Sequence, residues 1–408
     1  MIKRINTILL ALLASIIVFA GTISENSMPD TALLKKAKRI HDEAIVVDTH
    51  VDTPMMMHER GLDIGTRSED SEVDLIKMKE GGLDAAFFAV YTPHSMDDKN
   101  PSKIALDVID TIYTQVEKYY DLAEIAYTPE DIERIQETGK RAILIGMENG
   151  SPIEDSLGLL RTFYRLGVRY ITLTHNENNK VCDSSTADEP KWNGLSPFGI
   201  EVVKEMNRIG MMVDVSHISD KAFWDVIKYS KAPVIASHSC VKSICDTNRN
   251  MSDDMIKALA DNGGVIQINF FGGFLSKELE LKSKDIRKQL APIREQLREQ
   301  FKDNEKEVMK RMMAEYKKLA PPSPSIDLLM DHIDYAVKLA GVDHVGLGSD
   351  FDGASSYPVG LEDASKYPLI TYKLLERGYG ERDIKKILGG NILRVFDEVM
   401  ETAEDMKD

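Results

Sequence analysis

Short apolar runs rich in β-branched and aromatic residues alternate with longer segments of helical periodicity along most of the chain. Near-continuous apolar character is typical of strands buried on both faces, as in a parallel sheet. We predict strands over residues 44–48, 85–91, 142–147, 170–174, 211–215, 234–237, 265–269 and 344–348. Eight strands alternating with helices favour an α/β fold of the (β/α)8 TIM-barrel type, with a doubly wound open sheet as the alternative.

One long gap breaks this alternation. Residues 276–320 are strongly charged and show helical periodicity, and a proline-rich stretch follows before a helical segment over 327–340. We therefore predict that a helical arm is inserted over 276–325. A charge-rich helix is usually a solvated face, and a lid or a subunit contact is the alternative role for this arm.

The first thirty residues differ from the rest of the chain. Lys3 and Arg4 precede an apolar run over 8–20 that ends in small residues, an order typical of a secretory signal peptide. We expect residues 1–20 to be removed, leaving an exported protein, periplasmic or secreted, with a single domain over 31–408. The alternative is an uncleaved membrane anchor, although so short a run is marginal for spanning a bilayer.

Composition excludes one class of function and leaves the cysteines open. A formal net charge of −16 argues against a nucleic-acid binder, because neutralising phosphates requires clustered Lys and Arg. The three cysteines, Cys182, Cys240 and Cys245, are an odd number, so at least one is unpaired in an exported chain. A bridge between Cys240 and Cys245 stays open, since spacing alone does not show the required geometry.

Residues that commonly bind metals recur where the predicted strands end. The first strand closes with Asp48-Thr49-His50-Val51-Asp52, and His50 and Asp52 project to the same side because they lie two apart on extended chain. Later strands end at Glu148, His175, His217, His238 and Asp350. The carboxyl ends of barrel strands share one rim, where catalytic residues gather. Imidazole and carboxylate ligands without thiolates suit zinc or another borderline cation.

The other histidines show no such placement. We predict that His41 and His332 lie in helices, His58 and His94 in loops, and His344 at the entrance of the last strand, all in structural or surface roles. Cys182 and Cys240 fall near the rim, so a cysteine nucleophile beside an imidazole is a rival hypothesis.

Seven motifs, in this order, resemble those of the membrane (renal) dipeptidase family of zinc peptidases, which has many bacterial members. The resemblance covers nearly the whole chain after the leader. Besides the first-strand motif quoted above, the motifs are Gly146-Met147-Glu148-Asn149-Gly150, Leu173-Thr174-His175-Asn176, Asp214-Val215-Ser216-His217, Ser237-His238-Ser239, Asn248-Arg249-Asn250 and Gly348-Ser349-Asp350-Phe351-Asp352-Gly353.

The resemblance implies a (β/α)8 barrel, usually a homodimer, that binds two zinc ions, although other divalent cations are possible. It implies that His50, Asp52 and Asp350 surround one ion, that His217 and His238 surround the other, and that Glu148 bridges them. His175 and Arg249 match positions that hold the substrate. The chain departs from many relatives at Phe271, where they have Tyr, and in its longer arm.

We therefore expect hydrolysis of dipeptides. Two cations sharing one carboxylate can activate a shared water and polarise the scissile carbonyl. Asp350 is expected to move the proton, His175 to support the oxyanion and Arg249 to pair with the terminal carboxylate of the substrate. The alternatives are another amidohydrolase-like reaction, such as hydrolysis of a cyclic amide or a β-lactam, and a non-catalytic metal-binding or solute-binding protein.

Overall fold

A computed structural model describes residues 31–97, 99–302, 305–319 and 323–407, so the predicted signal peptide lies outside the described residues. Eight parallel strands form one sheet in the order β1-β2-β4-β5-β6-β7-β8-β9. Their bounds are β1 Val47–Val51, β2 Ala85–Tyr91, β4 Arg141–Glu148, β5 Val168–Thr172, β6 Met212–Asp214, β7 Ile235–Ser239, β8 Val265–Ile268 and β9 Val345–Leu347. All eight predicted strands are present, displaced by up to three residues at their ends.

The sheet closes on itself through the ends of its first and last strands. Val51 and Phe351 form an isolated parallel bridge. The amide of Asp52 donates to the carbonyl of Phe351 at 2.7 Å, and the amide of Asp350 donates to the carbonyl of His50 at 3.0 Å. This closure identifies the barrel rather than the open sheet, as predicted.

Two strand assignments were incomplete. The first strand begins at Val47 rather than residue 44, because the amide of Ala44 still bonds to His41 at the end of the preceding helix. A ninth strand, β3 (Ala123–Ile125), was not predicted. It is only three residues long and pairs with β4 alone, off the path of the barrel, so its sequence pattern is too short to detect.

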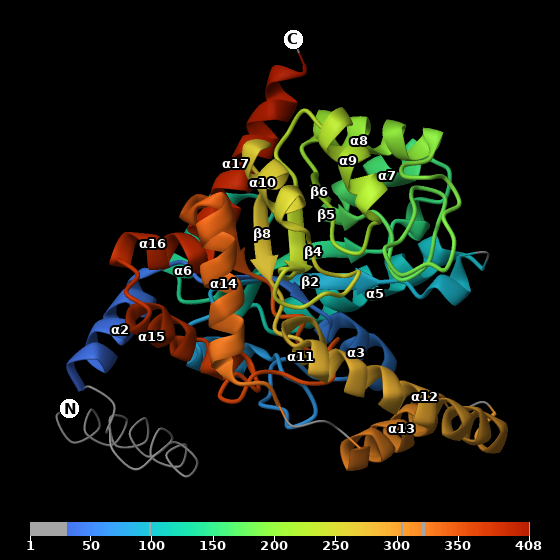
Figure 1. Cartoon of the computed structure of the whole chain (residues 1–408), viewed down its shortest axis with the longest axis horizontal. Coiled ribbons are helices and arrows are strands. Elements are labelled where there is room, and N and C mark those ends of the chain that lie inside the picture. The colour runs from blue at the N-terminus through green and yellow to red at the C-terminus, as the bar shows by residue number, and fades with distance from the viewer. Residues whose placement is uncertain (1–30, 98, 303–304, 320–322, 408) are drawn as a thin grey trace.

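Helices cover the outside of the barrel (Figure 1). Their bounds are α2 Thr31–Glu43, α3 Thr53–Arg60, α4 Leu75–Glu80, α5 Pro101–Lys118, α6 Pro129–Glu137, α7 Leu157–Arg165, α8 Pro197–Ile209, α9 Asp220–Tyr229, α10 Asp253–Asp261, α11 Gly272–Leu275, α14 Ile326–Ala340, α15 Pro368–Glu376, α16 Glu381–Lys385 and α17 Asn391–Asp405, with a π-helical turn, η6, at Lys386–Gly390. Serine begins several of them. Ser196, Ser219 and Ser252 each accept a hydrogen bond from a backbone N–H of the first turn, which satisfies a donor that the helix leaves free.

Apolar side chains fill the amino end of the barrel, whereas polar side chains occupy its carboxyl end. The interior cluster includes Val47, Phe87, Leu144 and Tyr170, and Phe396 of α17 packs into the same cluster. A second, larger cluster lies between the sheet and the surrounding helices. The barrel is therefore a packed core with chemistry confined to one rim.

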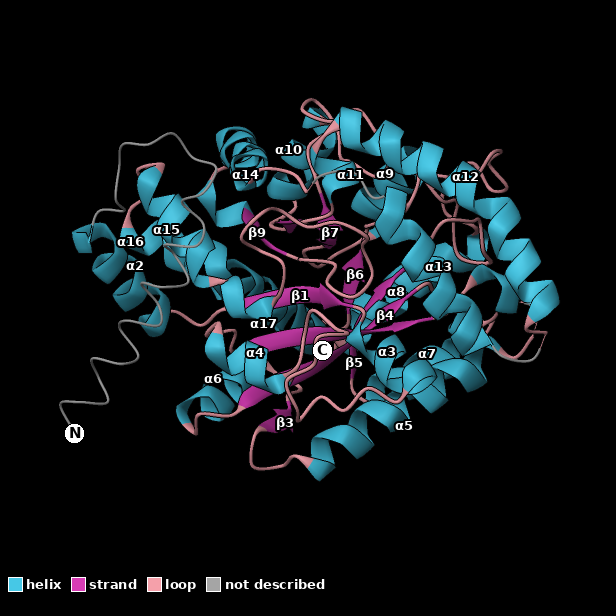
Figure 2. Cartoon of the chain, turned by 90° about the horizontal axis from the view of Figure 1, so that it is seen from below, coloured by secondary structure: helices cyan, strands magenta, loops and turns pink. Residues whose placement is uncertain are grey.

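Two helices occupy the segment predicted as an insertion: α12 (Lys277–Gln300) and α13 (Glu305–Leu319). They lie against each other and project from the body on the side toward which the β8 arrow points in Figure 1. The view from that side shows the same arm beyond the barrel (Figure 2). Tyr316 of α13 donates to the hydroxyl of Ser355 at 2.7 Å, which ties the arm to the loop after β9.

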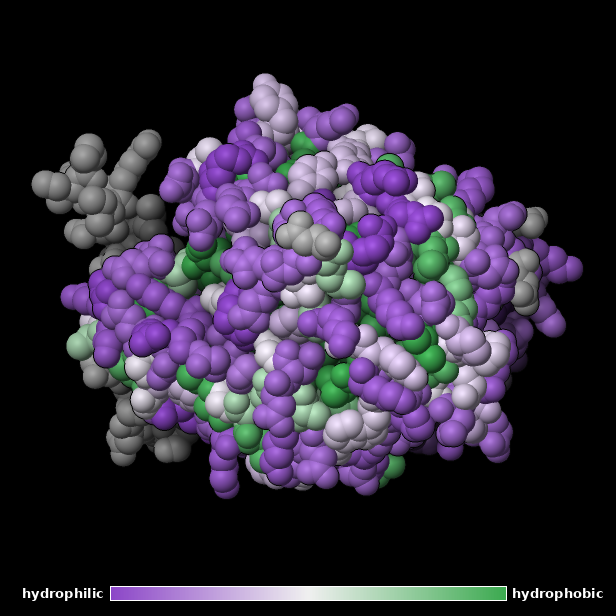
Figure 3. All heavy atoms as spheres, turned by 90° about the horizontal axis from the view of Figure 1, so that it is seen from above, coloured by the Kyte–Doolittle hydropathy of each residue, from purple (hydrophilic) through white to green (hydrophobic). Residues whose placement is uncertain are grey.

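The opposite face, seen in Figure 3, is mostly hydrophilic, with small hydrophobic areas between hydrophilic side chains. In the part of the chain that the structure describes, no helix combines the length and the apolar character needed to cross a membrane.

Candidate metal centre

The fold brings all seven metal-ligand candidates to the carboxyl rim of the barrel. His50, Glu148 and His238 belong to strands β1, β4 and β7, and Asp52 directly follows β1. The other three candidates each come three residues after a strand ends, namely His175 after β5, His217 after β6 and Asp350 after β9.

Glu148 lies at the centre of the cluster. Its Oε1 is 3.1 Å from Nε2 of His217 and 3.5 Å from Nε2 of His238. The same oxygen is 3.6 Å from Nε2 of His175 and 3.7 Å from Nε2 of His50. One buried carboxylate oxygen is thus surrounded by four imidazole nitrogens, as a bridging ligand would be.

Among the residues that the structure describes, three sets of side chains offer ligand atoms within 4.8 Å of one another. The set of His50, Asp52 and Asp350 matches the grouping expected around one ion. His217 and His238 fall in separate sets that share Glu148, but their Nε2 atoms are only 2.9 Å apart. His175, expected to hold substrate, joins the set of Glu148 and His217, because it lies as close to Glu148 as the other imidazoles do.

The donor set fits a pair of divalent cations. Nε2 of His50 is buried and has no hydrogen-bond partner among the described residues, an arrangement that is costly unless something pairs with it. The Nε2 atoms of His217 and His238 lie 2.9 Å apart, and a cation bound to both would replace a hydrogen shared between them. Imidazole nitrogens and carboxylate oxygens without thiolates are ligands that zinc accepts.

The electrostatics of the cluster favour the ligand forms of these residues. Burial and Arg249 hold the pKa of His217 well below 6.5, and burial and His50 do the same for His238, so both imidazoles are neutral. Burial would raise the pKa of Glu148, but His175 and His50 outweigh it, and the pKa lies well below its usual range.

The pKa values of His50 and Asp350 are raised, whereas those of His217, His238 and Glu148 are lowered. Burial disfavours the charged form of His50, but Glu148 and Asp52 outweigh it and raise its pKa to about 10. Burial, with Glu148 nearby, raises the pKa of Asp350 to about 6. Carboxylates that draw a proton onto a buried imidazole create a strongly negative site, and a cation would replace that proton.

Residues behind the cluster that the sequence did not single out orient its side chains. The hydroxyl of Tyr170 lies 2.8 Å from Nδ1 of His50, and Nδ2 of Asn269 donates to Asp350 at 2.9 Å. Ser237 Oγ lies 2.7 Å from Nδ1 of His238. Tyr170 and Ser237 lie within predicted strands, and Ser237 also begins one of the seven motifs, but the sequence assigns no role to either residue. The available signal was a hydroxyl in an otherwise apolar strand beside a candidate ligand.

The two predicted substrate residues lie beside the cluster. His175 meets Tyr91 edge to face, with ring centroids 4.8 Å apart. Arg249 is 6% exposed, donates from Nη2 to the carbonyl of His238 at 3.2 Å, and stacks over Phe274. Its Nε is buried without a partner. Phe271, the departure from the family pattern, packs on Phe274 in the same area.

The structure answers both questions that the sequence left open about the cysteines. Cys182, Cys240 and Cys245 are free and buried, so the possible bridge between Cys240 and Cys245 is not formed. Cys240 donates to the carbonyl of Asn269, and burial raises the pKa of both Cys182 and Cys240 above the ordinary value for a thiol. A nucleophile needs the opposite shift, toward the thiolate.

The histidines expected to be structural lie outside the cluster. His41 lies between Thr371 and the carbonyl of Gly81, and His344 bonds to the carbonyl of Gly264. His332 bridges Val241 and Leu275. His58, predicted in a loop, lies in α3 instead, because the helix that Pro54 starts continues to Arg60; its side chain is exposed, as is that of His94.

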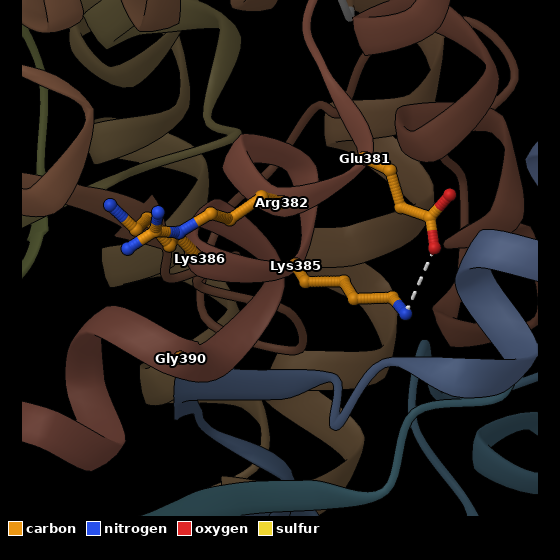
Figure 4. Close-up of a pocket in the computed structure, with 5 residues that line it drawn as sticks. All are labelled: Glu381, Arg382, Lys385, Lys386 and Gly390. Atoms are coloured by element: carbon orange, nitrogen blue, oxygen red, sulfur yellow. Dashed lines mark ion pairs between the residues drawn. The ribbon is translucent and has the colours of Figure 1, made fainter.

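A hollow of about 530 Å³ lies elsewhere, lined by Glu381, Arg382, Lys385, Lys386 and Gly390 (Figure 4). Lys385 pairs with Glu43 and Glu381. Lys386 pairs with Asp343. With both lysines neutralised, this surface offers no comparable cluster of ligands or nucleophiles.

Known proteins share this chain's sequence and fold. The family described as membrane dipeptidase, peptidase family M19, matches residues 34–408. The dipeptidase verJ of Clonostachys rogersoniana is 34% identical over 95% of this chain and 92% of its own length, and dipeptidase 3 of Rattus norvegicus is 32% identical over 92% and 69%.

Among solved structures, the probable dipeptidase PvdM from Pseudomonas aeruginosa superposes with a TM-score of 0.78 and 29% identity, covering 92% of this chain and all of that one. The family match, the sequence identity and the shared barrel agree with the resemblance of the seven motifs. The chain belongs to the membrane dipeptidase family.

Proposed function

We propose that this chain hydrolyses dipeptides with two zinc ions bound around Glu148. The chain is a metal-dependent dipeptidase, as its family and relatives show. The number of ions and their identity are our proposal. The observation that carries it is the position of Glu148 Oε1, which lies 3.1–3.7 Å from four imidazole nitrogens.

The family resemblance divides the cluster into two halves that share Glu148. His50, Asp52 and Asp350 would hold one ion, and His217 and His238 would hold the other. Ligands that are all nitrogen or oxygen fit zinc, and they also fit other divalent cations. Bound zinc would lower the pKa of a coordinated water toward neutrality and polarise the carbonyl of the substrate.

Asp350 would accept the proton from the attacking water and return it to the leaving amine. Asn269 holds its carboxylate from the side at 2.9 Å. In the metal-free site, burial and Glu148 raise the pKa of this carboxyl group to about 6. Its place beside the other proposed ligands is what suits it to carry the proton of the attacking water.

His175 and Arg249 would hold the substrate. Burial lowers the pKa of His175 below 6.5, so its neutral ring can donate one N–H to the developing oxyanion. Arg249 presents a buried, unpartnered Nε near the cluster, and its planar fork suits a terminal carboxylate. A charged fork at a set distance from the reacting carbonyl would limit the C-terminal side of the substrate to one residue.

The central test removes the proposed bridge. Glu148→Ala should lose both zinc ions and all measurable dipeptide turnover, because each half of the cluster depends on that carboxylate. Zinc per chain is measured by elemental analysis after gel filtration, together with hydrolysis of a dipeptide. Glu177→Ala, an exposed change on the same rim, is the control and should keep both. Two tightly bound zinc ions with normal turnover in Glu148→Ala would contradict the proposal.

Asp350→Asn separates proton transfer from metal binding. An amide can still coordinate weakly but cannot accept the proton, so this variant should keep much of its metal and lose turnover. Turnover equal to that of the wild type would exclude the proton-transfer role. A homodimer, which the family resemblance implies, remains a prediction.

A further inference from the structure

We infer that Ser237, anchored by Asp214, is a positioning residue that sets which ring nitrogen of His238 carries the hydrogen. The inference rests on the proposed function, since His238 matters here as a zinc ligand. Asp214, Ser237 and His238 form one connected chain of hydrogen bonds, which we name the Asp214 relay.

The relay begins at a buried carboxylate that accepts hydrogen bonds at both oxygens. Oδ1 of Asp214 accepts from the amides of Ser216 at 3.0 Å and Ser237 at 2.8 Å. Oδ2 accepts from the hydroxyl of Thr172 at 2.5 Å and that of Ser237 at 2.6 Å. Asp214 is fully buried, and each of its oxygens is contacted by two donors. The hydroxyl hydrogen of Ser237 is therefore committed to Asp214.

The relay ends at the imidazole. Ser237 Oγ is 2.7 Å from Nδ1 of His238, and its single hydrogen already points to Asp214. Oγ must therefore accept, so Nδ1 of His238 carries the hydrogen. A neutral imidazole protonated at Nδ1 has its lone pair on Nε2, the nitrogen that faces Glu148 at 3.5 Å and His217 at 2.9 Å. The hydroxyl thus selects the tautomer that a metal ligand requires.

A parallel arrangement orients His50. The hydroxyl of Tyr170 donates to the carbonyl of Thr49 at 3.1 Å, so it can accept from Nδ1 of His50 at 2.8 Å and leave Nε2 to face the cluster. Gly146 makes room for the ring of Tyr170, since a Cβ at position 146 would lie 2.2 Å from that ring. His217 lacks such a partner, because its Nδ1 is buried without a hydrogen bond. Of the three proposed histidine ligands, His238 is the one whose Nδ1 the Asp214 relay contacts.

The first test compares two buried serines of the same strand. Ser237→Ala removes the acceptor of His238, whereas Ser239→Ala removes a hydroxyl that contacts only the hydroxyl of Ser216, at 3.4 Å. Zinc affinity is measured on the whole protein by competition with a chelator. Ser237→Ala should weaken one of two zinc sites by about 10- to 100-fold, the usual effect of losing such a partner, and Ser239→Ala should weaken neither.

The outcomes separate the two proposals. A wild-type protein that binds no zinc would defeat the binuclear proposal. Two zinc sites in the wild type with unchanged affinities in Ser237→Ala, or an equal loss in both serine variants, would overturn the relay.

A second measurement does not depend on how the serine variants fold. Nitrogen NMR of labelled histidine side chains in the metal-free wild type distinguishes the two tautomers, and the signals lost in His238→Gln assign the residue. We expect His238 to carry its hydrogen on Nδ1. A hydrogen on Nε2 would overturn the relay, whatever metal the protein binds.

Discussion

His217 and Asp350 adopt left-handed backbone conformations, with φ of 69° and 61°, which residues with side chains rarely adopt. Each lies in a turn just past the end of a strand, and each turn is held by a bond to its backbone: Ser185 donates to the carbonyl of His217, and the amide of Asp350 donates to His50. The backbone strain at these two predicted functional residues is maintained by the structure around them.

Gly353 shows how closely the rim is packed around these carboxylates. A Cβ at this position would lie 1.9 Å from Oδ2 of Asp52 and 2.7 Å from Oδ1 of Asp350. A larger residue at this position would displace two proposed ligands at once.

Arg249 carries the first prediction at the residue scale. Arg249→Ala should weaken hydrolysis of a dipeptide much more than that of its C-terminal amide, because the free carboxylate would lose its buried partner at a cost of about 2–5 kcal/mol. Steady-state constants for dipeptide, dipeptide amide and tripeptide with both enzymes measure the difference. The wild type should prefer the dipeptide. Equal turnover of the amide or the tripeptide would refute the role of the carboxylate.

The second prediction at the residue scale concerns His332. Its Nδ1 accepts from the amide of Val241 at 3.1 Å and its Nε2 lies 3.1 Å from the carbonyl of Leu275, so the buried ring fits only when neutral. Burial lowers its pKa from 6.5 to about 4. As pH falls, His332 therefore binds a proton at a higher pH in the unfolded chain than in the folded protein. Stability from this group is complete above pH 6.5 and declines between 6.5 and about 4, by on the order of 3 kcal/mol.

Denaturant unfolding of the metal-free protein at several pH values tests this. His332→Asn should be less stable at neutral pH and should lose less further stability between pH 6.5 and 4 than the wild type. Because both proteins share every other titrating group, the difference in slope isolates His332. Identical slopes would mean that the ring titrates normally in the folded state.

At the scale of elements, the barrel closes beside three proposed ligands, His50, Asp52 and Asp350. β1 and the segment after β9 share one bridge and two backbone bonds, and Thr53 adds a hydroxyl bond to Asp352 at 2.5 Å. Ser349 and Tyr367 both donate to Asp48 behind this seam. Few backbone hydrogen bonds join β1 to the segment after β9, and proposed ligands lie on both sides of this seam. A bound metal should therefore stabilise the closed barrel.

Metal removal should therefore loosen this seam before the rest of the barrel. Chelation should lower the melting temperature and speed amide hydrogen exchange in residues 50–53 and 349–353. Peptides from α8, which lies away from the seam, should keep their exchange rates. Exchange that rises uniformly over the chain, or not at all at the seam, would contradict this coupling.

At the scale of the whole molecule, we propose that the protein is exported. The proposal rests on the basic, apolar and small residues of the leader, which lies outside the described residues. The mature chain should begin near Gly21, since Ala20 ends the small-residue pattern. Mass spectrometry of protein from its native cells identifies the first residue. An intact N-terminus on membrane-bound protein would favour the uncleaved anchor instead.

The sequence by itself determined the eight strands alternating with helices, the shared rim and the residue types of the cluster, and it favoured the barrel over an open sheet. Eight apolar runs of strand length require burial on both faces, and candidates placed at their carboxyl ends must share one rim in a parallel barrel. The local sequence pattern also predicted the helical arm that α12 and α13 form, because charge-rich helical periodicity does not depend on distant contacts. The family resemblance supplied the expected division of ligands, which spacing alone does not give.

Only the tertiary structure decided how these residues meet. The central position of Glu148 depends on four strands and loops converging to within a few ångströms, and no local pattern encodes such distances. Tyr170 lies in a predicted strand, and Ser237 and Asp214 begin two of the motifs. Only their contacts across neighbouring strands show that they orient His50 and His238. The free cysteines follow the same reasoning, since a bridge depends on the relative direction of two side chains, which spacing does not record.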